Sequence, residues 1–328
     1  MKLALRSSIV AWVTLSKRWG QLASPQSSSA FAAPSIEGTV PVLNGGSIIP
    51  EDPTCVEWVS WVPPRTYPAL VMQIVSEDYV DLERNFMRLM ELNSVFTRHH
   101  LYLMCMDNAS VQTFASLGIR CVPLDLLPFD SIHDVWKTRI RALSCLVMEG
   151  YNVIMSDADA LWLGDPMTYF SLPAVRNSSV VSSRGNMPWR LSKKWGVALC
   201  LGFILFRATG PGMDMLQMSM EEIVLDRGDD QVAANKAVNQ LGVVWDEDSD
   251  MRLYNSTGLG RGVIGRLGSD DNPFVISLLP HNAFTRRCDS NPISNETVVA
   301  HCHSTRRVGK RVYWMQEANL WLLDGSDP

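Results

Sequence analysis

A chain of 328 residues, 46% of them hydrophobic and 19% charged, can bury one large core, which rules out disorder over most of its length. Its net charge of -5 and pI near 5.7 give no general attraction to phosphate backbones, so nucleic acid is not an expected partner. The seven cysteines form no C-x-x-C pair, which argues against a zinc site.

Residues 1–33 have the composition of a targeting segment. Lys2 and Arg6 come first, and the apolar stretch from Ile9 to Leu15 follows them. A segment rich in Ser, Ala and Pro comes next. The apolar part is shorter than the roughly 20 residues of a membrane-spanning helix. A signal peptide, a weak signal-anchor that would associate the protein with a membrane, and an organelle transit peptide therefore all stay open.

Residues 34–64, rich in Ser, Pro, Gly and Ala, predict a flexible stem, and the folded body is expected over 65–328. Four cysteines lie inside apolar runs, where a thiol usually packs as a small hydrophobe, whereas Cys288 and Cys302 lie in polar surroundings and could pair. Passage through the secretory pathway, with residence in the Golgi, would agree with four Asn-x-Ser/Thr sequons. The sequons begin at Asn108, Asn177, Asn255 and Asn295.

The first half of the body alternates short apolar runs with longer amphipathic ones. Strands are predicted over 69–75, 101–106, 119–122 and 153–155, with helices over 79–92, 110–117 and 133–149 between them. This order predicts an α/β fold with a parallel sheet covered by helices. Gly118 and Gly150 follow the second and third helices, where a left-handed residue ends a helix.

The second half is less regular. Strands are predicted over 180–183, 198–207, 243–245, 275–279 and 297–301, and helices over 212–225, 230–241 and 312–323. Such a pattern usually adds antiparallel strands to the sheet and makes it mixed.

Asp157 and Asp159 follow the predicted strand 153–155 directly. Open α/β sheets bind their ligands at this edge, beyond the carboxyl ends of the strands. Two carboxylates so close repel each other unless a cation lies between them or one is protonated, so the pair predicts Mn²⁺ or Mg²⁺. Asp-x-Asp alone is a common pattern, but the preceding strands and helices and the following Gly164-Asp165-Pro166 favour a functional site.

With these residues the chain resembles the nucleotide-diphospho-sugar transferases of glycosyltransferase family 77, over about 67–323. The strongest similarity lies in Trp136-Lys137 through Val153, in Asp157-Ala158-Asp159 and in Leu161 through Pro166. The resemblance implies a GT-A fold and metal-dependent transfer of a sugar from a nucleotide sugar, a UDP-sugar above all. The acceptor would be a glycan or glycoprotein, and the anomeric configuration would be retained.

The resemblance also implies the metal ligands. Asp157 would face the ribose and the metal, Asp159 would bind the metal directly, and His301, or else His303, would complete the coordination. A neutral imidazole and carboxylate oxygens suit Mn²⁺ chemically.

The donor and the acceptor are assigned in the same way. Asp230 and Gln231 resemble the family's Asp-Gln pair that contacts the sugar or acceptor, with a helix N-cap as the alternative role for Asp230. Lys137 would reach the donor, or else be a surface lysine. Lys310 and Arg311 belong to a basic cluster with Arg306 and Arg307 that could close over the diphosphate.

Gly202 also matches the family's donor site, but Cys200-Leu201-Gly202 stands where relatives usually have Asn-x-Gly. The departure removes an amide that would bond the donor sugar. Which sugar is carried therefore stays open.

Two other functions use the same residues. A haloacid dehalogenase-like phosphatase also has Asp-x-Asp at a strand end, but on its first strand, whereas here about three strands precede the motif. A non-catalytic carbohydrate-binding protein could use exposed tryptophans such as Trp189 and Trp195. A phosphoaspartate trapped at Asp157, or glycan binding indifferent to nucleotide and Mn²⁺, would favour these alternatives.

Overall fold

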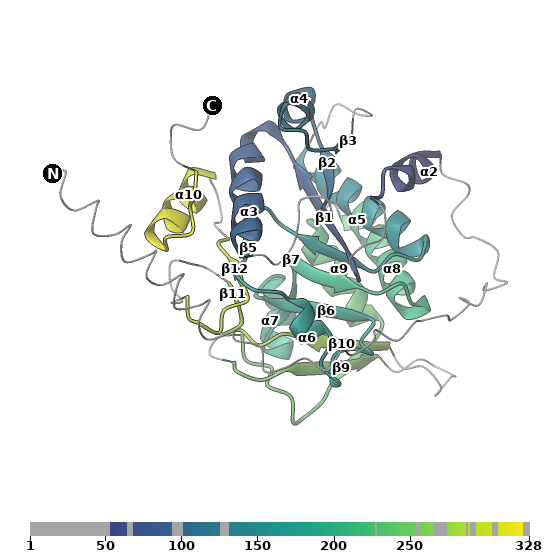
Figure 1. Cartoon of the computed structure of the whole chain (residues 1–328). Helices are drawn as coiled ribbons and strands as arrows, with labels where there is room; N and C mark the ends of the chain where they lie inside the picture. Colours follow the sequence, from purple (N-terminus) through teal and green to yellow (C-terminus); the bar gives the residue numbers. More distant parts are fainter. Residues whose placement is uncertain are drawn as a thin grey trace, which may run out of the picture. The chain divides into compact units, whose positions relative to one another are not determined.

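The computed structural model describes residues 53–63, 68–93, 101–124, 131–226, 228–253, 256–264, 274–286, 288, 293–303 and 308–323 (Figure 1). The predicted targeting segment, most of the predicted stem, Asn255, Arg306 and Arg307 lie outside these ranges. Within them, no helix is both long and apolar enough to cross a membrane.

The main sheet carries the site. In the described part of the chain it has nine strands in the order β3-β2-β1-β4-β7-β6-β10-β9-β8. Their bounds are β1 Leu70–Val75, β2 Leu101–Cys105, β3 Cys121–Pro123, β4 Val153–Ser156, β6 Val180–Gly185, β7 Ala198–Phe206, β8 Val243–Trp245, β9 Gly260–Ile264 and β10 Phe274–Leu278. The first four strands in that order are parallel, while β7 runs antiparallel to both β4 and β6. The predicted α/β class and mixed sheet are confirmed.

Helices cover both faces of this sheet (Figure 1). One face packs against α2 (Pro53–Ser60), α5 (Ile132–Met148), α8 (Gly210–Asp226) and α9 (Asp230–Gln240), and the other against α3 (Val80–Leu92), α4 (Asn108–Ser116) and α10 (Val308–Glu317). The helices form because their apolar residues recur at helical spacing, as in Leu82, Phe86 and Leu89 on α3, all buried. Gly118 and Gly150 have φ of +67° and +86°, which confirms the predicted left-handed ends of α4 and α5.

A second, small sheet lies beside the end of β4. Its strands are β5 (Ala160–Trp162), β11 (Phe284–Arg286) and β12 (Val299–His301), in the order β11-β12-β5. The antiparallel pairing of β12 with β5 sets His301 opposite Ala160. The sequence predicts β12 but not β5 or β11, nor the short helices η1 (Glu77–Tyr79), α6 (Met167–Phe170) and α7 (Trp189–Trp195).

The C-terminal end of the predicted stem is structured. A flexible stem is expected as far as residue 64, whereas α2 buries Trp58 against the body and Cys55 is bonded to Cys145 on α5. The Tyr102 hydroxyl also donates to the Trp58 carbonyl oxygen at 2.6 Å. The ordered body therefore reaches back at least to Pro53.

Three disulfides join six of the seven cysteines: Cys55–Cys145, Cys105–Cys121 and Cys288–Cys302. The expected pairing of Cys288 with Cys302 is present. The expectation that cysteines in apolar runs pack as free thiols holds for Cys200, which is buried and reduced, but is wrong for the half-cystines of β2, β3 and α5.

One buried carboxyl group has no part in the candidate site described below. Glu83 on α3 is fully buried, and its carboxyl oxygens lie 2.5 and 2.9 Å from the side-chain amide of Gln73 on β1. Burial raises the pKa of Glu83 to about 8, so the folded protein holds a proton there at neutral pH.

Between pH 4.5 and about 8 the folded state therefore retains a proton that the unfolded chain releases. Stability is full below this window and falls by about 1.4 kcal/mol for each pH unit crossed within it. We predict that Glu83→Gln, which mimics the protonated acid, removes this loss in thermal melts from pH 5 to 8. Glu91→Gln, an exposed position on the same helix, should keep it. Equal slopes for Glu83→Gln and the wild type would contradict the assignment.

Candidate metal and donor site

The turn Asp157-Ala158-Asp159 connects β4 to β5 at the carboxyl edge of the main sheet. Three backbone hydrogen bonds fix it. The Asp157 amide donates to the Gly202 carbonyl at 2.8 Å, the Ala160 amide to the Asp157 carbonyl at 2.9 Å, and the Cys302 amide to the Asp159 carbonyl at 2.7 Å. The turn is thus attached to β7 on one side and to the end of β12 on the other.

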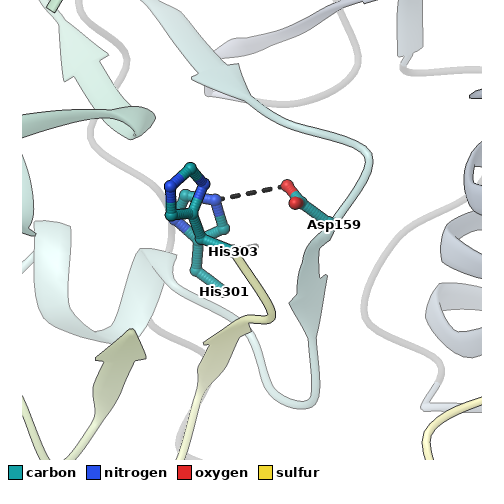
Figure 2. A group of neighbouring side chains, drawn as sticks. All are labelled: Asp159, His301 and His303. Carbon is teal, nitrogen blue, oxygen red and sulfur yellow. Dashed lines mark ion pairs between the residues drawn. The ribbon is translucent and has the colours of Figure 1, made fainter. Parts of the chain in front are cut away.

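Asp159 is buried beside two imidazoles. Its Oδ1 lies 3.2 Å from His301 Nε2, and one ligand atom from each of Asp159, His301 and His303 lies within 4.8 Å of the others (Figure 2). Burial alone would raise the pKa of Asp159, but its cationic neighbours, first His301 and then Arg311, outweigh burial and hold that pKa well below its usual range. Burial lowers the pKa of His301, and Asp159 more than offsets this and raises it to about 10. The protein alone therefore holds an ion pair here.

These donors fit a divalent cation. A carboxylate oxygen with two imidazole nitrogens is a ligand set that suits Mn²⁺. Burial, reinforced by the charges of His301 and Arg286, lowers the pKa of His303 to about 4, so His303 presents the neutral ring that a metal ligand needs. Asp157 lies next to this group, with its Oδ2 3.8 Å from His301 Nε2. The structure thus brings together Asp157, Asp159 and His301, and places His303, the predicted alternative to His301, in the same group.

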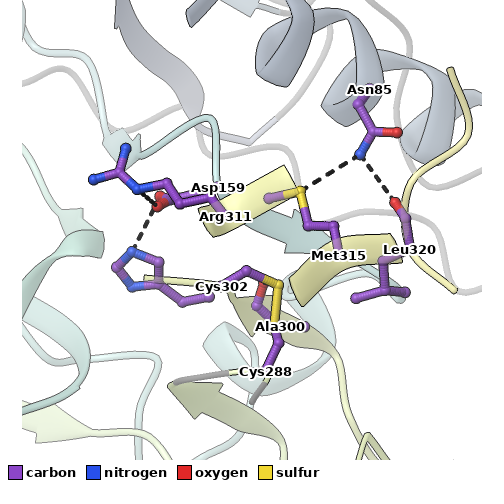
Figure 3. The surroundings of a disulfide bond; sticks show 9 residues. Asn85, Asp159, Cys288, Ala300, Cys302, Arg311, Met315 and Leu320 are labelled. Atoms are coloured by element: carbon purple, nitrogen blue, oxygen red, sulfur yellow. Dashed lines mark hydrogen bonds and ion pairs between the residues drawn. A yellow bond between two sulfur atoms is a disulfide. The ribbon is translucent and has the colours of Figure 1, made fainter. Parts of the chain in front are cut away.

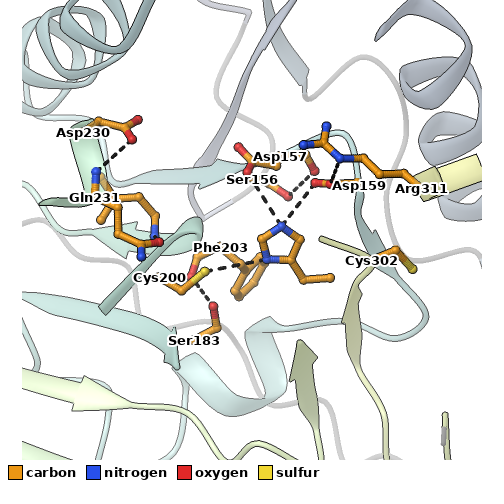
Figure 4. A network of polar contacts seen from close by, with 12 residues as sticks. Ser156, Asp157, Asp159, Ser183, Cys200, Phe203, Asp230, Gln231, Cys302 and Arg311 are labelled. Atoms are coloured by element: carbon orange, nitrogen blue, oxygen red, sulfur yellow. Dashed lines mark hydrogen bonds and ion pairs between the residues drawn. The ribbon is translucent and has the colours of Figure 1, made fainter. Parts of the chain in front are cut away.

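An arginine pairs with each aspartate of the motif, and Figure 4 shows the pair of Arg311 with Asp159. Arg139 on α5 bridges two carboxylates, with Nη2 2.9 Å from Asp157 Oδ1 and Nε 3.2 Å from Asp230 Oδ2. Arg311 on α10 places its Nε 3.0 Å from Asp159 Oδ2. The carboxylates of the site are therefore compensated by cationic side chains in the protein alone.

Asn85 contacts the helix that carries Arg311 and the residues just after it (Figure 3). Asn85 on α3 is buried and donates through Nδ2 to the Leu320 carbonyl at 2.9 Å, while its Oδ1 accepts from the Leu322 amide at 2.7 Å. The Arg311 guanidinium also lies 5.1 Å from the ring of Tyr79. These contacts hold α10 and its arginine over the aspartate turn.

The sequence names Lys137 as the donor contact of α5, but the structure turns Arg139 toward the carboxylates and leaves Lys137 exposed. Two residues along a helix differ by about 200° in direction, so only one of this pair can face the sheet. The sequence could have indicated Arg139, because it directly precedes Ile140 and so lies at the edge of the apolar stripe that the helix buries.

Asp230 and Gln231 begin α9, and both reach the site. Asp229 rather than Asp230 is the N-cap, since its Oδ1 accepts from the Val232 amide at 2.6 Å, so the alternative role for Asp230 is wrong. Burial raises the pKa of Asp230 to about 6, against the opposing effect of Arg139. The Gln231 side chain accepts from the Leu201 amide at 3.3 Å and donates to the Met187 carbonyl at 2.9 Å.

Gly202 leaves the space that the histidine occupies. A Cβ at this position would lie 2.2 Å from His301 Cε1 and 2.8 Å from Asp157 Oδ2, so no other residue fits without displacing the site. Lys310, by contrast, is exposed on α10, and its role stays a prediction. The two tryptophans of the carbohydrate-binding alternative differ. Trp189 is 57% exposed, but Trp195 is buried against Trp245, and its expected exposure is wrong.

A sequence model of the nucleotide-diphospho-sugar transferases matches residues 96–315, which is more than half of the chain and contains the whole aspartate, histidine and arginine group. The chain belongs to the nucleotide-diphospho-sugar transferase family. The predicted family and transferase class are confirmed, which sets aside the phosphatase and the non-catalytic alternatives. Membership of glycosyltransferase family 77 stays a prediction. No curated protein matches the chain.

Solved glycosyltransferases are remotely similar to this nucleotide-diphospho-sugar transferase. GlyE of Streptococcus pneumoniae TIGR4 is 14% identical with a TM-score of 0.46, over 79% of this chain and 61% of that one. The galactosyltransferase LgtC in complex with donor and acceptor sugar analogues is 14% identical with a TM-score of 0.36, over 50% of this chain and 69% of that one. The chain thus spans about three fifths of GlyE, and the residue roles rest on the geometry above.

We predict that Gly202→Ala displaces the His301 ring and lowers affinity for Mn²⁺ at least about tenfold, the order of loss expected when a ligand is misoriented. Isothermal titration calorimetry measures the affinity, and circular dichroism checks that the protein stays folded. Gly210→Ala is the matched control, because a Cβ there meets nothing within 4 Å. Wild-type affinity in Gly202→Ala would contradict this geometry.

Proposed function

We propose that the protein is a metal-dependent glycosyltransferase that moves a sugar from a UDP-sugar to a glycan or glycoprotein acceptor with retention of configuration. The observation that carries the proposal is the buried Asp159 beside the imidazoles of His301 and His303. Asp159 follows the carboxyl end of β4, a strand in the parallel part of the mixed sheet, in a chain of the nucleotide-diphospho-sugar transferase family.

The charges around the turn support a site that exchanges partners. In the protein alone, Asp157, Asp159 and Asp230 face the cations Arg139, Arg311 and His301, three charges of each sign. A nucleotide sugar brings a diphosphate, for which guanidinium groups are good bidentate partners. Arg139 and Arg311 are therefore placed to pass from the carboxylates to phosphate oxygens once the carboxylates have another cation.

Asp159, His301 and His303 would hold that other cation, with Asp157 beside them. When bound, a divalent metal neutralises the charge that grows on the departing diphosphate. Enzymes accelerate such reactions at least about a millionfold, or about 8 kcal/mol of selective stabilisation, which makes charge compensation at the leaving group a large contribution. Asp230, held by Arg139, and Gln231, bonded beside Gly202, are proposed to orient the transferred sugar or the acceptor.

We predict that UDP binds the full-length protein tightly only with Mn²⁺, and that Asp159→Asn removes this dependence by lowering the ligand charge without changing side-chain volume. Isothermal titration of UDP with and without Mn²⁺ measures both. Glu149→Gln, an exposed position at the end of α5, is the control and should behave as the wild type. The proposal fails if the wild type and Asp159→Asn bind UDP equally with and without the metal.

We also propose that the protein works in the secretory pathway, in the Golgi lumen. Three disulfides are stable in an oxidising compartment, and Asn108, Asn177 and Asn295 are exposed and open to glycosylation.

Protein secreted from eukaryotic cells should accordingly have one titratable thiol after denaturation, and its electrophoretic mobility should rise after treatment with an N-glycosidase. Several free thiols and unchanged mobility would contradict this location. Reduction before denaturation is the control, and should expose all seven thiols.

A further inference from the structure

Cys200 has an unusual place among the cysteines of this chain. It is reduced, although the other six are paired, and it is 1% exposed on β7. Its Sγ lies 3.7 Å from Nδ1 of His301 (Figure 4). The thiol is therefore in direct contact with the ring nitrogen that faces away from the carboxylates.

β7 forms a cradle for the His301 ring. Gly202 provides the space, since its missing side chain would overlap His301 Cε1. Cys200 precedes it by two residues and so projects from the same side of the strand. In sequence terms, the cradle is the Cys-x-Gly segment that departs from the family's Asn-x-Gly.

The neighbouring strand β6 holds this part of β7 in place. Ser182 Oγ accepts from the Cys200 amide at 3.0 Å, and Ser183 Oγ donates to the Phe203 carbonyl at 3.1 Å. The pairing register shifts between the two serines, an irregularity that often re-aims a side chain beside a functional site. The position of the sulfur is thus set by the sheet.

The two nitrogens of His301 have different surroundings. Nε2 faces Asp159 at 3.2 Å and Asp157 at 3.8 Å, where the proposed cation would lie. A metal-binding imidazole needs its other nitrogen protonated and held by an acceptor, because this fixes the tautomer and the ring angle. Among the side chains of the described residues, the hydrogen-bond partner of Nδ1 is the sulfur of Cys200.

We propose that Cys200 is a positioning residue that accepts the Nδ1–H of His301 and thereby aims Nε2 at the cation. The role rests on the proposed function, since it orients a ligand of the metal proposed there. A small buried hydrophobe would fill the same volume but would leave the Nδ1–H without its acceptor.

The test measures Mn²⁺ affinity of the full-length protein by titration calorimetry without nucleotide. Cys200→Ala should weaken binding about tenfold to a hundredfold, the usual loss for the outer partner of a metal-binding histidine. Cys200→Ser, which keeps an acceptor, should recover part of that loss. Leu199→Ala is the control: Leu199 is buried on the opposite face of β7, so this variant should be less stable but bind Mn²⁺ as the wild type does. Wild-type affinity in Cys200→Ala would overturn the proposal.

A second measurement separates this role from the proposed function. In ¹H–¹⁵N spectra of the metal-free protein, the Nδ1–H signal of His301, assigned by its loss in His301→Gln, should exchange slowly in the wild type and Leu199→Ala but rapidly in Cys200→Ala. If the three proteins show these exchange rates but the wild type binds no Mn²⁺, the proposed metal dependence fails and the positioning role stands. If the signal is unchanged in Cys200→Ala, the positioning role fails whatever the metal result.

Discussion

The site depends on neutralising the charge of one carboxylate, that of Asp159, which is buried at the end of β4. Asp159 is 3% exposed, and a buried charge of this kind is tolerated only when opposite charges and hydrogen bonds surround it. Each nearby element brings one such partner. The small sheet brings His301 and α10 brings Arg311, while the disulfide Cys288–Cys302 ties down the residue that follows the histidine. β12 and α10, both late in the chain, therefore pack beside the turn that follows β4.

Much of the first half is readable from sequence because its signals are local. Apolar runs of three to seven residues, amphipathic helices and the left-handed glycines Gly118 and Gly150 place the ends of β1 through β4 to within two residues. β5 and β11, with three residues each, carry no period long enough to detect, and they form because β12 lies beside them. The sequence also gives no sign of the Cys55–Cys145 disulfide, whose two cysteines are 90 residues apart.

The candidate site divides in the same way. The spacing of Asp157 and Asp159 after a buried strand predicts a charged site. The resemblance to the transferase family predicts that a late histidine belongs to it. The sequence does not single out Arg139, because the phase of α5, rather than residue type, decides which cation faces the sheet. The contact between Cys200 and His301 joins residues 101 positions apart and emerges only once β7 and β12 are placed. Family membership thus predicts the chemistry, and the three-dimensional structure supplies the partners that tune it.

We propose that a divalent cation and a diphosphate replace the internal ion pairs of the aspartate turn. A crystal grown with Mn²⁺ and UDP tests it most directly through the anomalous scattering of manganese. We expect a peak within about 2.3 Å of Asp159 and His301, with the Arg311 guanidinium moved from the carboxylate to a phosphate oxygen. Arg139 and Arg311 still paired with Asp157 and Asp159, and no manganese between the carboxylates and the histidines, would contradict it.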